Sequence, residues 1–253
     1  MTNPASSSLA AILVACAVLL PIPAGAADGE VLINQAAVNA GGITPGDGPG
    51  FPVTISQRGK YKLSGILAVP TGVDGIDVTV EDVTIDFNGF TIRSAPAGAA
   101  KIGISAFGAR LTVMNGTVLG FGRGGIVTDA AFAVIENMRI LNGSEVGVLV
   151  GNDARVLKST ISKNKFGGIE CGARCLIQDN LVTLTLIGNG IRLQQGGVVL
   201  GNTIALNDSF GILALSAPVG FGNNSLSNNN GGGAQISNNL VPMHPNACSP
   251  ACP

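Results

Sequence analysis

The 253-residue sequence has no tryptophan, one tyrosine and one histidine, and only 11% of its residues are charged. Binding clefts for sugars usually carry aromatic platforms, and beyond nine phenylalanines this chain has almost none. Its 14 basic residues nearly balance 15 acidic ones and form no basic stripe, so we expect no nucleic-acid partner. The single histidine, His244, lies near the C-terminus without a recognisable partner, and we assign it no role.

The N-terminus has the pattern of a targeting segment. An apolar run from Leu9 to Leu20 contains no charge and is followed by prolines and the small residues Ala24–Ala26. This pattern predicts a signal peptide over residues 1–26 and a secreted or periplasmic protein. Lipid anchoring at Cys16 is the minor alternative, because Leu13–Cys16 also resembles a lipoprotein cleavage site. No later segment is long and apolar enough to predict a transmembrane span.

The most informative pattern is a repeat of 21 or 22 residues in which glycine precedes an aliphatic residue. The glycines of the repeat are Gly103, Gly125, Gly147, Gly168, Gly190 and Gly211, with Gly233-Ala234 as a weaker last copy. A fixed period in this range indicates a solenoid, in which each repeat buries its apolar face against its neighbours. None of the repeats contains the ten or more residues of helical periodicity that a βα unit needs.

Two further columns follow the same period and consist mostly of β-branched residues, which favour strands. The first column is Val113, Ile135, Val156, Ile177, Val199 and Phe221, and the second is Val118, Ile140, Ile161, Val182, Ile204 and Leu226. Three short strands per repeat predict an all-β fold, a single-stranded parallel β-helix of about seven coils. We expect it to be right-handed, because parallel crossovers almost always are. A leucine-rich repeat has a similar period, but its leucine pattern is absent.

Asparagines also recur with the period, and we interpret them as turn residues that hydrogen-bond from coil to coil. One predicted column is Asn115, Asn137, Ser159, Asn180, Asn202 and Asn224, and a second is Asn164, Asn207 and Asn229. The composition along the chain suggests four regions. These are the signal peptide (1–26), an N-terminal cap with the first strands (27–82), the β-helix repeats (83–237) and a Pro/Cys-rich C-terminal cap (238–253).

Four cysteines remain after the predicted signal peptide and form two local pairs. In an exported chain such pairs are typical of disulfides. We expect Cys248–Cys252 and, with a weaker case, Cys171–Cys175. A zinc site that includes His244 is disfavoured, because the pairs are distant in sequence and each has three intervening residues. We therefore predict no metal site and no cofactor.

Residues 83–92 (VTIDFNGFTI), the aliphatic rows and the Gly-Ile turns resemble right-handed parallel β-helix repeat proteins of the pectin-lyase-like superfamily. The lead-in at residues 50–56 (GFPVTIS) is similar to uncharacterised secreted bacterial members. The resemblance covers about Phe51 to Ser237. It implies the fold but leaves function open, because this superfamily includes polysaccharide lyases, hydrolases, epimerases and non-enzymatic surface proteins.

The resemblance also implies where chemistry would take place, namely on the outer face of one sheet. Side chains alternate along a strand, so the outward column after each glycine should be Ser105, Val127, Leu149, Glu170, Arg192 and Leu213. Two residues further on it should be Phe107, Asp129, Gly151, Gly172, Gln194 and Leu215. Asp129, Glu170, Arg192 and Gln194 are therefore the candidate glycan-binding residues, although a surface ion pair explains Glu170 and Arg192 equally simply.

The catalytic features of the superfamily are not recognisable. A lyase would hold calcium with several carboxylates on adjacent coils, and the acidic stretch Asp74–Asp86 suits a solvated face better. We assign no catalytic residue, and whether the protein is an enzyme stays open. The preferred hypothesis is an exported carbohydrate- or surface-binding scaffold. The alternative is a lyase or epimerase acting on uronate-containing glycans, and only that alternative would involve calcium.

Overall fold

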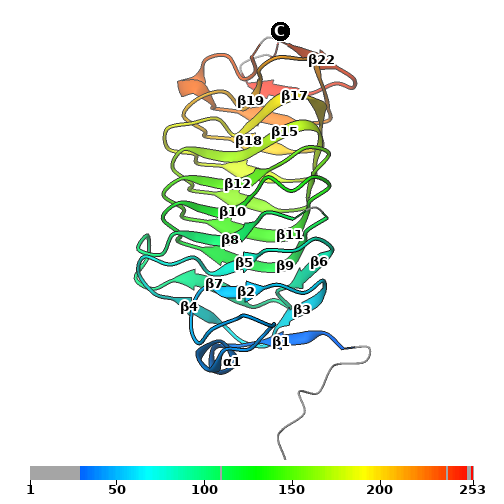
Figure 1. Cartoon of the computed structure of the whole chain (residues 1–253). Coiled ribbons are helices and arrows are strands. Elements are labelled where there is room, and N and C mark those ends of the chain that lie inside the picture. The colour runs from blue at the N-terminus through cyan, green and yellow to red at the C-terminus, as the bar shows by residue number, and fades with distance from the viewer. Residues whose placement is uncertain (1–28, 109, 238, 250–251, 253) are drawn as a thin grey trace, which may run out of the picture.

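The computed structural model describes residues 29–108, 110–237, 239–249 and 252. The predicted signal peptide, its cleavage site and Cys16 lie outside the described residues. The chain winds into a rod whose strands stack from one end to the other (Figure 1). All strand pairs are parallel, so the predicted parallel β-helix is confirmed.

Each coil contributes one strand to each of three faces. Face 1 contains β2 (Val53–Ile55), β5 (Ile76–Val78), β8 (Ile102–Ala106), β10 (Gly124–Thr128), β12 (Val146–Val150), β15 (Gly167–Gln178), β17 (Ile191–Leu200) and β19 (Ile212–Ala214). Face 2 contains β1 (Val31–Ile33), β3 (Gly59–Leu63), β6 (Val83–Asp86), β9 (Thr112–Leu119), β11 (Val134–Leu141), β13 (Arg155–Leu157), the later parts of β15 and β17, β20 (Val219–Gly222) and β22 (Leu240–Pro242). Face 3 contains β4 (Leu67–Val69), β7 (Thr91–Ser94), the later parts of β9 and β11, β14 (Thr160–Ser162), β16 (Leu181–Thr183), β18 (Thr203–Ala205), β21 (Ser225–Ser227) and β23 (Ala247–Ser249).

The rod has about nine turns rather than the predicted seven. The additional coils lie before Gly103 and after residue 237, where the 22-residue period is lost. Ile76, for example, pairs with Ile104, 28 residues later. The longer coil accommodates a loop around residues 95–100, so the strand register continues although the sequence period does not.

The coils turn at three corners, and most corner residues have a left-handed backbone. Between faces 1 and 2 these residues are Asp82, Arg110, Phe132, Asp153, Arg174 and Gly196. Between faces 2 and 3 they are Asn115, Asn137, Lys158, Asp179, Gly201 and Asn223. Between faces 3 and 1 they are Gly120, Asn142, Lys163, Leu184, Leu206 and Asn228. One left-handed residue per corner turns the chain sharply without interrupting the ladder on either side.

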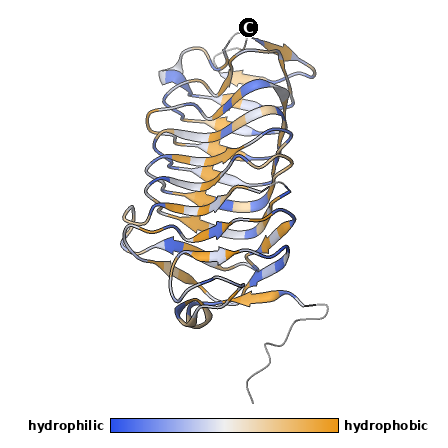
Figure 2. Cartoon of the chain, viewed as in Figure 1, coloured by the Kyte–Doolittle hydropathy of each residue, from blue (hydrophilic) through white to orange (hydrophobic). Residues whose placement is uncertain are grey.

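Aliphatic side chains fill the interior, and Figure 2 shows them stacked from coil to coil. The repeated glycines permit this close stacking. A Cβ at Gly168 would lie 2.4 Å from the carbonyl oxygen of Gly190, and the other glycines of the column face the following coil in the same way. The expected last copy, Gly233-Ala234, is wrong. Ile212 pairs with Ile236, because a 3-10 turn, η1 (Asn230–Gly232), shifts the register by two residues.

Two buried columns of amides stabilise the corners as predicted. The first contains Ser159, Asn180, Asn202 and Asn224, and continues to the partly exposed Asn246; the second contains Asn164, Thr185, Asn207, Asn229 and Gln235. Asn115 and Asn137 do not belong to the first column. The coil from Ile135 to Val156 is one residue shorter than its predecessor, so these two asparagines occupy the preceding, outward position.

Both ends of the rod carry additional segments. At the N-terminal end, the helix α1 (Gln35–Ala40) buries Val38 against the core and is capped by the side chain of Asn34 (Figure 1). At the other end, β22 and β23 extend faces 2 and 3, and Cys248 is bonded to Cys252. Among the described residues, no helix has the length and apolar character needed to cross a membrane.

Candidate functional site

The outward column of face 1 has the predicted order. The strand register places Thr54, Asp77, Ser105, Val127, Leu149, Glu170, Arg192 and Leu213 on successive coils. Inward neighbours such as Ile169 and Ile191 are fully buried, whereas Glu170 and Arg192 are partly exposed. The column thus has two polar ends separated by Val127 and Leu149.

Glu170 and Arg192 form the expected ion pair across neighbouring coils. Arg192 Nη1 donates to Glu170 Oε2 at 2.6 Å, and the two side chains are 32% and 22% exposed. A Cβ at Gly167 would lie 3.3 Å from Glu170 Oε1, so the missing side chain leaves this oxygen open. The pair therefore retains a free acceptor and further guanidinium donors for a ligand.

Asn189 adds a polar group that the sequence did not reveal. It precedes Arg192 by three residues, as Gly167 precedes Glu170, and Gly168 N donates to Asn189 O. Asn189 Oδ1 is buried and has no hydrogen-bond partner among the described residues. Buried acceptors are normally satisfied, so this oxygen marks a place where a ligand hydroxyl would be stabilised.

The other two candidate residues are not drawn into a tight cluster. Gln194 is exposed two residues after Arg192 on β17, and Ser216 donates to its main-chain oxygen. Asp129 is exposed beyond the end of β10, and its main-chain oxygen is covered by Gly151 of the next coil. Asp129 is two coils away from the strand of Glu170, about 10 Å. Only Glu170 and Arg192 are in direct contact.

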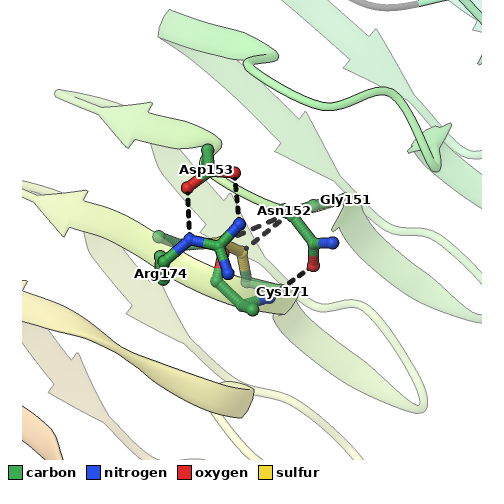
Figure 3. Close-up of polar contacts among 7 residues, drawn as sticks. Gly151, Asn152, Asp153, Cys171 and Arg174 are labelled. Carbon is green, nitrogen blue, oxygen red and sulfur yellow. Dashed lines mark hydrogen bonds and ion pairs between the residues drawn. A yellow bond between two sulfur atoms is a disulfide. The ribbon is translucent and has the colours of Figure 1, made fainter.

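The corner beside this column is tied by the disulfide Cys171–Cys175, which spans the bend within β15. Figure 3 shows Arg174 at this corner, where its guanidinium faces both carboxylate oxygens of Asp153 at 2.7 and 2.6 Å. The hydrogen bonds from Arg174 lower the pKa of Asp153. Asn152 Oδ1 accepts from Ala173 N at 2.8 Å. These contacts satisfy one another, so we interpret this corner as structural.

The acidic stretch 74–86 is divided among three environments. Glu81 and Asp82 pair with Arg58 and Arg110 at the corner between faces 1 and 2. Asp86 lies at another corner, and Asp74 and Asp77 lie on face 1. Within the described ranges, no three His, Cys, Asp or Glu side chains are grouped so that they could bind a metal ion.

Asp77 is the most perturbed carboxyl group on face 1. Its Oδ1 is buried without a partner among the described residues. Burial raises the pKa of Asp77, the neighbouring charge of Asp74 raises it further, and Lys101 acts in the opposite direction. A carboxyl group that favours its protonated form in the folded state suits proton donation.

We expect Asp77→Asn to raise the melting temperature at neutral pH. Below the unfolded-state pKa both states of the wild type are protonated, and the stabilising contribution of this proton is complete. As the pH rises through the higher folded-state pKa, the group must ionise where it is partly buried and stability is lost. Asparagine avoids that loss, so the gain over wild type should vanish in acid. Thermal unfolding between about pH 3 and pH 7 measures it, with exposed Asp208→Asn as the control; an unchanged difference across this range would contradict the assignment.

A groove between faces 2 and 3 was not anticipated. It has a volume of about 450 Å³, and its lining includes Asp86, Asn88, Asn115, Asn137 and Arg139. We call these five residues the polar groove. Their side chains come from β6, β9 and β11 and the turn after β6, so they occupy three consecutive coils.

The amides of the polar groove form a directed chain. Asn137 Nδ2 donates to Asn115 Oδ1 at 3.0 Å, and Asn115 Nδ2 donates to Asp86 Oδ1 at 3.1 Å. Arg139 is exposed and has no ion-pair or side-chain hydrogen-bond partner among the described residues. The sequence showed Asn115 and Asn137 but put them in the buried column, since a one-residue change in coil length is invisible in the pattern.

Comparisons with known proteins bear on the fold. No protein-family model matches the chain, and no curated protein matches its sequence. Among solved structures, the tailspike protein gp208 of Dettilon is similar with a TM-score of 0.55 and 15% identity, over 75% of this chain and 42% of the tailspike. The chain thus spans less than half of that protein's length. The A-module of the mannuronan C-5 epimerase AlgE4 from Azotobacter vinelandii is similar with a TM-score of 0.51 and 12% identity, over 82% of this chain and 70% of that module. With these similarities and its three parallel faces, the chain has the fold of a right-handed parallel β-helix protein.

Proposed function

We propose that this protein is an exported, carbohydrate-binding β-helix, and that the polar groove binds an acidic polysaccharide. The observation that carries the proposal is the combination, in one groove, of an unpaired guanidinium with amides on successive coils. The epimerase with a similar structure is named for a polyuronate, mannuronan, which supports this choice of ligand class. The two disulfides support export, because such bonds persist in oxidising compartments.

The groove offers different partners at its two ends. Arg139 presents a planar set of donors that suits a sugar carboxylate. Asn137 and Asn115 offer amide groups to ring hydroxyls, and Asp86 is an acceptor at the far end. Coils follow one another at about 4.8 Å, which is comparable to the length of one sugar in an extended chain. Successive sugars can therefore meet successive coils.

The face-1 residues Glu170, Arg192, Gln194 and Asp129 are the second proposed contact surface. The open Oε1 of Glu170 and the buried Asn189 Oδ1 support it. This surface is flanked by Leu149 and Leu213 rather than by further polar groups, so we rank it below the polar groove.

A binding assay with polymannuronate and other uronate polymers tests the proposal after a glycan-array screen. We expect Arg139→Ala to weaken binding by about 10- to 100-fold, because a hydrogen bond to a charged group contributes about 1.5–3 kcal/mol. The matched control is Arg155→Ala, an exposed arginine on face 2 with no ion pair. Wild-type protein that binds no acidic glycan would overturn the proposal, as would equal binding by the Arg139 and Arg155 variants.

The Glu170→Ala, Arg192→Ala double variant decides between the two surfaces. If it alone loses binding, the ligand occupies face 1 and the polar groove is not the site. The double variant removes both members of the pair, so neither charge is left unpaired.

The alternative function is a uronate lyase or epimerase on face 1. The specific observation in its favour is Asp77, a carboxyl group with a raised pKa beside Asp74 on the outward column. Incubation with uronate polymers, with and without calcium, tests it through the absorbance of unsaturated products and the proton NMR signals of epimerised sugars. Neither product forming from a polymer that the protein binds would eliminate the alternative.

A further inference from the structure

A second groove lies at the corner between faces 3 and 1. It measures about 410 Å³, and its lining includes Asn142, Lys163, Lys165, Leu184 and Leu186. Two rows of side chains flank it. The corner residues Asn142, Lys163 and Leu184 form one row, and Ser144, Lys165 and Leu186, each two residues later, form the other. The buried residues Asn164 and Thr185 lie between the rows and form its floor.

Charge and hydrophobicity are segregated along this groove. One coil contributes both lysines, and the next coil, about 4.8 Å away, contributes both leucines. Among the described residues, neither lysine has an ion pair, although Glu145 and Asp208 lie on the flanking coils. Lys165 Nζ is 5.1 Å from the centre of the Phe166 ring, which helps to fix its position. Two ammonium groups therefore adjoin an apolar slot.

The apolar side chains of this corner are not required by the core. Leu186 is 61% exposed and Ile187 is 50% exposed. Leu184 and Leu206 have left-handed backbones with φ of 59° and 58°, where other coils have Gly120, Asn142 or Asn228. A left-handed conformation is uncommon for a bulky residue. Leucines in such positions, beside other exposed apolar residues, mark an interaction surface.

We propose that this leucine–lysine groove binds a small amphiphilic anion, with its carboxylate, sulfonate or phosphate between Lys163 and Lys165 and its apolar part between Leu184 and Leu186. Complementary charge carries the choice of an anion, and the adjoining leucines carry the choice of an amphiphile. This ligand class and this corner are distinct from the sugar and the polar groove of the proposed function.

Two fluorescent probes that share the same aromatic rings test the proposal. Anilinonaphthalene sulfonate carries a negative charge, and N-phenyl-1-naphthylamine carries none. Since the chain has no tryptophan, its own emission does not interfere. We expect Leu186→Ser to weaken both probes by about 10-fold or more. The double variant Lys163→Gln, Lys165→Gln should weaken only the sulfonate by about 10-fold, and monomeric dodecanoate should displace it from the wild type.

Matched controls are Leu32→Ser and Lys60→Gln, exposed residues near the N-terminal end of the rod. All four positions are exposed, and circular dichroism verifies that each variant folds. Sulfonate binding that is absent, that falls equally in the controls, or that survives the lysine substitutions would overturn the proposal. Two other occupants would also overturn it. These are a second copy, shown by a dimer that Leu186→Ser dissociates without any dodecanoate binding, and a membrane, shown by binding to phosphatidylglycerol vesicles but not to monomeric dodecanoate.

Discussion

Replacing Asn202 with alanine is expected to destabilise the protein by about 2–5 kcal/mol, because each buried polar group left without a partner costs about 1–3 kcal/mol. Asn202 Oδ1 accepts from both the main-chain and side-chain nitrogens of Asn180. Its Nδ2 donates to Ile177 O and Leu200 O as well as to Asn224 Oδ1. The side chain is almost fully buried, so water cannot replace these bonds.

Urea-induced unfolding of the oxidised chain measures this loss. Asn246→Ala is the graded control, since Asn246 occupies the end of the same column and is partly exposed. We expect a clearly smaller effect there, because solvent can hydrate the groups that lose a partner. A loss at Asn202 no greater than at Asn246 would show that the column does not stabilise the coils.

The second large effect is expected for Gly168→Ala, at about 3 kcal/mol, the upper part of the usual range for overpacking. The added Cβ would lie 2.4 Å from Gly190 O and 2.5 Å from a methyl carbon of Val182. Gly190 O accepts from Ile169 N, so the coil that would have to move is fixed by the ladder itself. Relief of the clash would separate two coils over their whole width.

Gly48→Ala provides the comparison, because a Cβ there has no neighbour within 4 Å and its φ is not positive. Chemical denaturation should find that variant close to wild type. If both substitutions proved equally mild, the repeated glycine would have to be explained by something other than coil packing.

The tilt of the sequence pattern toward strands, and its beat of 21 or 22 residues, were sufficient to predict the coils from Gly103 onward. The same pattern failed where a loop lengthened a coil, as between Ile76 and Ile104, and where η1 displaced the last copy. Parallel pairing tolerates such insertions because the extra residues project from a corner. A periodicity search does not, since it compares positions at a constant spacing.

The candidate sites were less accessible. Glu170 and Arg192 could be paired in advance because both lie on strands whose alternation is regular. Asn115 and Asn137 could not be separated from Asn180 and Asn202, because one missing residue at a corner exchanges a buried place for an exposed one. The residue type is the same in both columns, and only the depth of the side chain differs.

Local preference and spacing therefore specified the kind of molecule, a stack of parallel coils with aliphatic rows inside and asparagine at the corners. Three-dimensional assembly decided which polar groups remain unsatisfied at the surface, including Arg139, Glu170 Oε1 and the lysine pair Lys163 and Lys165. The physical reason is that coil stacking is periodic and reports itself in the sequence. A groove depends on the relative depth of side chains from several coils, which has no period.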